Sequence, residues 1–177
     1  MWYVIQTKCG EEQEVVELIR KTVSKEYYWE CFFPLYENVW KSQGIHVKIE
    51  SLFQGYICIK TTNPDALFLE LKKLSRLSKI LISGDKNSQY AFLSLNQEEE
   101  DFLNHIIGSD KEYTVRRTYI ERNKLGQIVE VQGPLQYYLE NLVKVDFKNR
   151  RAFIELKFLG EVRRIKLGIR LPKDDVI

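Results

Sequence analysis

Apolar and polar residues change their spacing along the first part of the chain, and each change predicts a new element. WYVIQT (2–7) is a short apolar and aromatic run that predicts a strand, which Gly10 ends. Residues 11–25 place apolar side chains at helical spacing, with acids in the first turn as the helix dipole favours. The chain is therefore expected to begin with a strand and an amphipathic helix.

Strand-like patterns return over the next thirty residues or so and are followed by a second helix. The runs 31–40 and 45–51 predict two strands joined by a Ser-Gln-Gly turn, and 52–60 predicts a third strand. Asn63 suits the N-cap of a helix and Pro64 its first position. The second helix is therefore expected to begin at Pro64.

Two more strands and a helix complete this part of the chain. Strands are predicted over 79–83 and 90–95, separated by a polar turn. Asn96, with Glu99 three residues later, forms a capping box that opens the last helix. The element order is β-α-β-β-β-α-β-β-α, which predicts an α+β domain with helices over an antiparallel sheet.

The helical period is absent from the last third of the chain. Residues 109–116 are polar and lack periodicity, so they predict a linker. The runs that follow are TVRRTYIE, QIVEVQG, ENLVKVDF, AFIELKF and VRRIKLGI. Short strands so closely spaced predict a small β-barrel. The expected organisation is an N-terminal domain over 1–108, a linker over 109–116 and a barrel over 117–177.

Composition places the chain among soluble globular proteins. It is 44% hydrophobic and 29% charged, and no apolar run approaches the roughly 20 residues of a membrane span. The N-terminus lacks the basic start and apolar stretch of a signal peptide. Cys9, Cys31 and Cys58 are each expected to be buried reduced thiols, because they are far apart and odd in number. A cytoplasmic protein without membrane contact is expected.

Residues that could carry chemistry are not grouped in the sequence. His46 and His105 lack ligand partners at metal-binding spacing, and neither a nucleophile elbow nor a phosphate-binding loop is present. The acids at 11–12 and 98–100 begin helices and are expected to face water. The sequence therefore predicts no enzyme, catalytic residue, metal site or cofactor.

Charge divides unevenly between the two parts of the chain. Residues 1–108 carry a net charge of −3, whereas residues 109–177 carry +5. A polarised charge of this kind suggests that the C-terminal part meets a polyanion.

The turn KNRR (148–151) joins two predicted barrel strands and is unusually basic. A hairpin that places residue 157 near 163 and residue 151 near 169 would extend this basic surface across two strands. The predicted RNA-binding residues are Lys148, Arg150, Arg151, Arg163, Arg164, Lys166 and Arg170. Arginine suits bidentate phosphate and guanine contacts, and a convex basic surface suits a structured RNA hairpin. The alternative is that these charges only protect edge strands from aggregation.

Three motifs, in order, resemble those of the NusG family of transcription elongation factors over nearly the whole chain. They are WYVIQT followed by Gly and an acidic helix; LFQGYICIK, which is similar to the L-F-P-G-Y strand signature; and IVEVQGPL with the following strands, which resembles a KOW motif in a small barrel. The C-terminal half resembles the specialised antitermination paralogues of the LoaP type. Two departures are Gln54 in place of the signature proline, and QYYLEN (136–141) in place of the second KOW glycine.

The resemblance implies a polymerase-bound regulator. In this family the N-terminal domain docks on the clamp helices of the RNA polymerase β′ subunit and reaches towards the β subunit, which favours processive antitermination. The residues matching the polymerase-binding aromatic patch are Trp2, Phe53, Tyr56 and Ile82. Trp2 and Phe53 could instead belong to the core. The barrel is expected to contact a hairpin in the nascent RNA leader.

Two other functions fit the same residues. The chain could be an RNA-binding or ribosome-associated protein that uses its barrel without polymerase. It could also be an adaptor whose barrel binds a ribosomal protein or a termination factor. A barrel rather than a helical C-terminal domain is expected in all states, because its strands alternate and carry no helical period.

Overall fold

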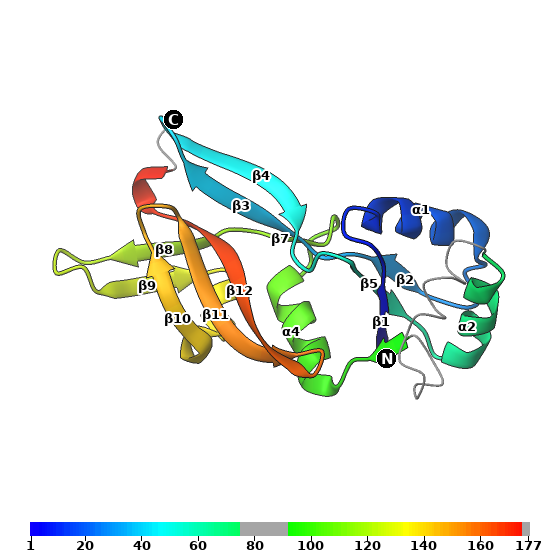
Figure 1. Ribbon diagram of the computed structural model, residues 1–177. Coiled ribbons are helices and arrows are strands. Elements are labelled where there is room, and N and C mark those ends of the chain that lie inside the picture. The colour runs from blue at the N-terminus through cyan, green and yellow to red at the C-terminus, as the bar shows by residue number, and fades with distance from the viewer. Residues whose placement is uncertain (75–91, 175–177) are drawn as a thin grey trace. The chain divides into compact units, whose positions relative to one another are not determined.

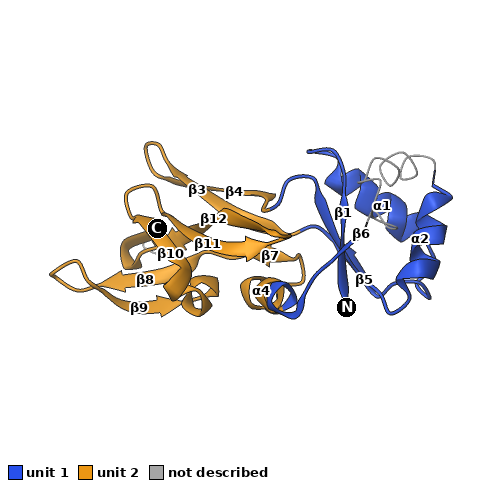
Figure 2. Cartoon of the chain, turned by 60° about the horizontal axis from the view of Figure 1, so that its bottom comes forward, with its two compact units in different colours: residues 1–33, 53–100 blue, residues 34–52, 101–177 orange. Residues whose placement is uncertain are grey.

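The computed structural model describes residues 1–74 and 92–174, which form two compact units (Figures 1 and 2). One unit contains residues 1–33 and 53–100, and the other contains residues 34–52 and 101–177. The division falls inside a helix, and it assigns residues 34–52 to the same unit as the C-terminal strands. The predicted boundary at residue 108 stays a prediction about which parts fold independently.

The first unit is an antiparallel sheet with helices packed against it. Its strands are β1 (Trp2–Gln6), β2 (Glu30–Phe32), β5 (Tyr56–Lys60) and β6 (Phe92–Ser94), in the order β2-β5-β1-β6. Its helices are α1 (Glu12–Thr22), α2 (Pro64–Lys72) and the beginning of α4 (Gln97–Ile107). The core includes Ile5 of β1, Ile19 of α1 and Leu67 of α2. The predicted α+β fold class is therefore confirmed.

Both predicted helix caps are present. The Asn63 side chain accepts a hydrogen bond from the Ala66 backbone N–H at 3.1 Å. The Asn96 side chain accepts from the Glu99 N–H at 2.9 Å, and the Glu99 carboxylate accepts from the Asn96 N–H at 3.0 Å. These reciprocal bonds satisfy two donors that a helix N-terminus otherwise leaves unpaired.

Two of the predicted strands differ in the structure. The run 31–40 is broken at Pro34, so that β2 stays in the first sheet and β3 (Leu35–Lys41) enters another. Proline lacks the N–H that a continuous ladder would need. The run 52–60 becomes strand only at Tyr56, because Gly55 has a φ of +80° and turns the chain. The predicted strand at 79–83 lies outside the described residues.

A hairpin opens the second unit. Strand β3 pairs antiparallel with β4 (Ile45–Ser51) and parallel with β7 (Thr114–Val115). The segment 109–116, predicted as a linker, therefore contains a strand and is ordered. Local spacing could not reveal this pairing, since the partner strand lies about eighty residues away in the sequence.

The remaining strands of the second unit form a half-barrel sheet in the order β10-β11-β12-β8-β9. Their bounds are β8 (Thr118–Arg122), β9 (Ile128–Gln132), β10 (Leu142–Asp146), β11 (Arg151–Phe158) and β12 (Glu161–Arg170). Short 3₁₀ turns lie at Pro134–Tyr137, Leu139–Asn141 and Pro172–Asp174. Ile120, Ile154 and Leu167 are among the buried side chains. The predicted barrel-type C-terminal fold is confirmed.

The register of the basic hairpin differs by one residue from the prediction. Arg151 pairs with Gly168, and Lys157 pairs with Val162. The turn holds two residues, Leu159 and Gly160, both with positive φ, as in the turns that match strand twist. The expected pairing of Lys157 with Arg163 was therefore wrong. Among the described residues no helix is long and apolar enough to cross a membrane.

Candidate functional site

The glycine of the FQGY motif is fixed by a buried carboxylate. Glu12 accepts hydrogen bonds from the backbone N–H groups of Gly55 at 2.5 Å and Gly10 at 2.8 Å. The Thr7 N–H donates to the Gly55 carbonyl at 2.7 Å, and a Cβ on Gly55 would lie 2.8 Å from the Thr7 carbonyl oxygen. Glu12 thus ties the start of α1 to the loop before β5, and the expectation that it faces water was wrong.

Trp2 is also held by an acid from a helix start. Its backbone N–H donates to Glu100 at 2.8 Å, while its buried ring meets the Phe32 ring edge-on at 5.3 Å between centroids. The Lys60 ammonium lies 5.1 Å from the centroid of the Trp2 ring. The acidic run 98–100 was expected to face water, but Glu99 and Glu100 are used inside the unit.

The predicted aromatic patch is more buried than exposed. Trp2 and Phe53 are both buried, and Tyr56 is partly exposed. Ile82 lies outside the described residues. An exposed aromatic that sequence reasoning missed is Trp29, which is 59% exposed and lies 5.9 Å from the Lys60 ammonium. Its only signal in the sequence is an aromatic run directly before a strand.

The KNRR turn contains one arginine that is structural. Arg150 is buried with a φ of +57°, and its guanidinium donates to the two oxygens of Asp174 at 2.6 and 2.8 Å and to the Phe147 carbonyl. Burial raises the pKa of Asp174, but the hydrogen bonds from Arg150 and from the Leu171 N–H outweigh it, so this pKa lies below its usual value. Arg150 joins the turn to the C-terminal 3₁₀ turn, and its predicted role as an exposed RNA-binding cation is corrected.

The rest of the turn is shaped by Asp146. Its carboxylate accepts from the Asn149 backbone at 3.0 Å, from the Asn149 side chain at 2.8 Å and from Arg151 at 3.3 Å. The bonds from Asn149 and Arg151 lower the pKa of Asp146 despite the opposing effect of burial. Lys148 is exposed at the tip and has no ion-pair partner in the part of the chain that the structure describes. The turn therefore presents Lys148 outward.

The other predicted cations lie along β12, on its two faces. Arg164 and Lys166 share the outer face, as predicted, opposite Glu155 and Phe153. Arg164 pairs with Glu155 at 2.9 Å. The ammonium of Lys166 lies 5.7 Å from the Tyr36 ring, and the guanidinium of Arg170 lies 5.2 Å from the Tyr119 ring.

Arg163 lies by the turn at 159–160. It donates to the Phe158 carbonyl at 3.0 Å and pairs with Glu161 at 3.5 Å. Strand β11 separates this turn from the basic turn by roughly 23 Å, at 3.3 Å per residue. The basic residues therefore do not form one continuous strip.

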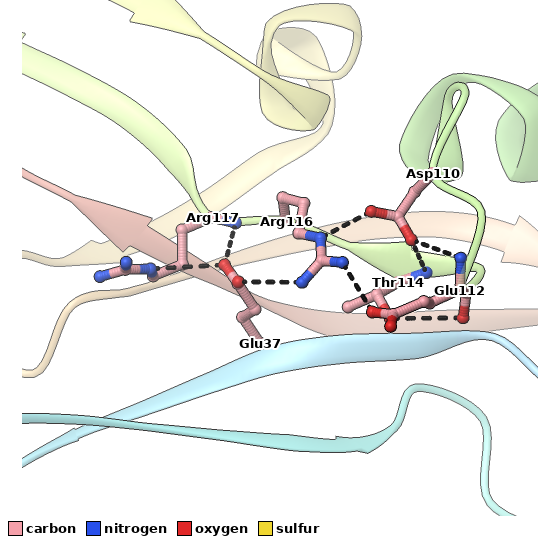
Figure 3. A network of polar contacts seen from close by, with 6 residues as sticks. All are labelled: Glu37, Asp110, Glu112, Thr114, Arg116 and Arg117. Atoms are coloured by element: carbon pink, nitrogen blue, oxygen red, sulfur yellow. Dashed lines mark hydrogen bonds and ion pairs between the residues drawn. The ribbon is translucent and has the colours of Figure 1, made fainter.

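A polar network orders the segment before β8 (Figure 3). Glu37 of β3 accepts from the Arg117 backbone N–H at 2.8 Å and pairs with Arg116 at 3.4 Å. Arg116 also pairs with Asp110 at 2.6 Å and Glu112 at 3.0 Å. Desolvation raises the pKa of Asp110, but the hydrogen bonds from Arg116 and nearby backbone groups bring it below its usual value. These two arginines therefore stabilise the fold through carboxylates of the same unit.

The KOW loop carries an aromatic cluster. The Tyr137 ring stacks on His105 of α4 at 4.7 Å, and the Tyr138 hydroxyl lies 3.1 Å from the His105 Nδ1. Phe102 meets Tyr138 edge-on at 5.2 Å. Burial raises the pKa of Tyr138 to about 12. The two tyrosines that replace the KOW glycine region therefore pack against α4, while Tyr137 remains largely exposed.

The cysteines do not form a reactive group. Cys31 and Cys58 are buried, and burial raises the pKa of Cys31 to about 12 and that of Cys58 further. Cys9 is exposed, which corrects the expectation that all three are buried. Within the described ranges, the His, Cys, Asp and Glu side chains form no group of three or more that could hold a metal ion.

Comparison with known proteins shows similarity along most of the chain. Residues 1–101 match the family model described as "Transcription termination factor nusG". The "Transcription termination/antitermination protein NusG" of Rickettsia conorii is 24% identical over 97% of this chain and 88% of its own length. The protein of that name from Helicobacter pylori strain J99 is 22% identical, over 94% and 93%. The solved structure described as "Domain interaction in Thermotoga maritima NusG" has a TM-score of 0.58 over 95% of this chain and 93% of that chain, at 16% identity, and shares its fold.

Proposed function

This chain belongs to the NusG family of transcription termination and antitermination factors, and on that premise we propose that it binds RNA polymerase through its N-terminal part and RNA through its barrel. In this proposal the N-terminal part docks on the β′ clamp helices and reaches the β subunit. The barrel contacts a hairpin in the nascent RNA leader. The result is processive antitermination of the LoaP type.

The observation that carries the polymerase proposal is the fixed loop before β5. The Gly55 N–H donates to Glu12 and the Gly55 carbonyl accepts from the Thr7 N–H, which fixes this loop, and Tyr56 follows Gly55 with its side chain partly exposed. Buried Trp2 and Phe53 support the surface from below in this proposal, and Ile82 remains in it through the family resemblance alone. A partly exposed aromatic at the start of a strand, next to a fixed loop, suits a protein interface, where such residues often dominate the binding energy.

The RNA proposal rests on the basic turn and on the net charge of the C-terminal part. The proposed contact residues are Lys148, Arg151, Arg164, Lys166 and Arg170. Arg150 is excluded because it is buried, and Arg163 is excluded because it lies on the opposite face of β12 from Arg164 and Lys166. Exposed lysines near phosphates release counterions on binding, so affinity should fall steeply with salt.

A second candidate is an adaptor whose barrel binds a ribosomal protein. It is favoured by three exposed apolar side chains in and after the KOW loop, Tyr137, Leu139 and Val143. A barrel that bound a protein through this surface would show little salt dependence.

Binding of the full chain to core RNA polymerase tests the proposal. Tyr56→Ala should weaken this binding by about 2 kcal/mol, a common cost for an interface aromatic. Leu69→Ala, which removes an exposed apolar side chain from α2 of the same unit, should bind like the wild type. Equal binding by Tyr56→Ala and wild type would contradict the proposed polymerase-binding patch. If the wild-type chain did not bind polymerase, the polymerase role itself would be contradicted.

A further inference from the structure

An arginine stacks on an aromatic ring next to the basic turn. Arg122, the last residue of β8, places its guanidinium carbon 3.8 Å from the centroid of the Phe147 ring. Phe147 begins the turn after β10, which is not a neighbour of β8 in the sheet. The stack therefore joins the end of β8 to the turn that contains Lys148, the residue after Phe147.

This arginine differs from most others in the unit. Arg116, Arg117, Arg150, Arg151, Arg163 and Arg164 all pair with carboxylates. Arg122 is exposed, and no carboxylate of the described residues lies within ion-pair distance of it. Neighbouring Glu121 accepts a hydrogen bond from the Tyr119 hydroxyl at 3.1 Å. One face of the Arg122 guanidinium rests on Phe147, which leaves its charge without a fixed counterion.

The turn that follows Phe147 is held by side-chain hydrogen bonds and ion pairs. Asp146 bonds Asn149 and Arg151, and Asp174 bonds Arg150, so the acids nearest the turn are already occupied. Arg122, stacked on Phe147, and Lys148, the residue that follows Phe147, therefore both lack an ion-pair partner among the described residues. A flat cation on a ring, next to a flexible cation, is the combination that binds a nucleotide: the plane takes the base and the ammonium takes the phosphate.

We propose that the Arg122–Phe147 stack is a platform for an unpaired RNA base, with Lys148 on the adjoining phosphate. The bases of a duplex are stacked on one another and do not offer a face, so the platform selects a loop or bulge nucleotide rather than the stem. This inference rests on the proposed RNA binding by the barrel and identifies which part of the RNA the barrel reads.

The test measures binding of the full chain to two labelled probes by fluorescence anisotropy. One probe is an RNA hairpin with a loop of unpaired nucleotides, and the other is the blunt duplex of the same stem. Arg122→Ala should weaken hairpin binding about tenfold, as for loss of one stacked base, and leave duplex binding unchanged. Arg122→Lys keeps the charge but lacks the plane, so it should also weaken hairpin binding.

Lys148→Ala should lower the salt slope of hairpin binding by about one counterion or less. Lys157→Ala, which removes an exposed lysine from the far end of β11, is the matched control and should change neither probe. Circular dichroism checks that each variant folds. If Arg122→Ala does not fold, the binding of Arg122→Lys alone tests the platform.

The outcomes separate the inference from the proposed function. A chain that binds neither probe would overturn RNA binding itself, and the platform with it. If the wild type and both Arg122 variants bind the hairpin with equal affinity, only the platform is overturned. Normal binding by Arg122→Lys with weak binding by Arg122→Ala would mean that charge acts without stacking, which also overturns it.

Discussion

Replacing Arg150 should destabilise the fold rather than remove an RNA contact. The side chains of Arg150 and Asp174 are only 9% and 4% exposed, and two hydrogen bonds of 2.6 and 2.8 Å join them. In Arg150→Ala the Asp174 carboxylate would stay buried with the Leu171 N–H as its remaining donor in this group. Breaking a buried pair from one side costs about 3–5 kcal/mol. For a chain of this size, a loss of about 3 kcal/mol in the free energy of unfolding lowers Tm by roughly 6–12 °C.

Arg151→Ala is the matched control, because it removes the neighbouring arginine and its own aspartate pair. The side chains of Arg151 and Asp146 are 39% and 17% exposed, so this pair should contribute no more than about 1 kcal/mol. Thermal unfolding followed by circular dichroism compares the two variants. Equal Tm values would refute the structural role of Arg150, as would an Arg150→Ala protein that unfolds like wild type but binds RNA about tenfold more weakly.

Three further predictions follow from the described contacts. Pairing keeps the pKa of Asp174 below its unfolded value, so the stability contributed by Asp174 is present above about pH 4 and is lost as pH falls through the folded pKa. The difference in unfolding free energy between wild type and Asp174→Asn should therefore shrink in acid. A difference that grew in acid would contradict this. Glu12→Ala should lower the free energy of unfolding, measured in urea, by about 1–3 kcal/mol, because it leaves two backbone donors unpaired. Glu98→Ala, at the exposed start of α4, should lower it far less, and equal losses would contradict the loop-fixing role of Glu12. Cys9 should react with a thiol reagent in the native protein while the two buried cysteines react only on unfolding; rapid reaction of all three would show that the core is open.

Local features were predicted well from the sequence. The caps at Asn63 and Asn96 depend on residues within three positions, and the structure contains both. The caps were readable because their partners lie close by in the chain. Gly55, in contrast, was predicted inside a strand, whereas its positive φ turns the chain before β5.

Long-range partners were not readable in this way. Glu12 looked like a solvent-facing helix acid, but the Gly55 N–H that it binds lies 43 positions away. Arg150 looked like one cation of a binding surface, and only the fold brings Asp174 to it. The one-residue shift in the β11–β12 register followed from turn length, which moves side chains to the opposite face. Surface roles inferred from spacing alone therefore failed where burial or register decided them.

Single-round transcription through a terminator, with purified core RNA polymerase, tests the central proposal most directly. The template carries either an RNA leader hairpin upstream of the terminator or the same length of unstructured leader. The wild-type chain should raise readthrough on both templates, and more on the hairpin template. Tyr56→Ala should lose this effect on both templates, and Lys148→Ala should lose it mainly on the hairpin template. Readthrough that wild type leaves unchanged on both templates, or that both variants raise as fully as wild type, would contradict the account.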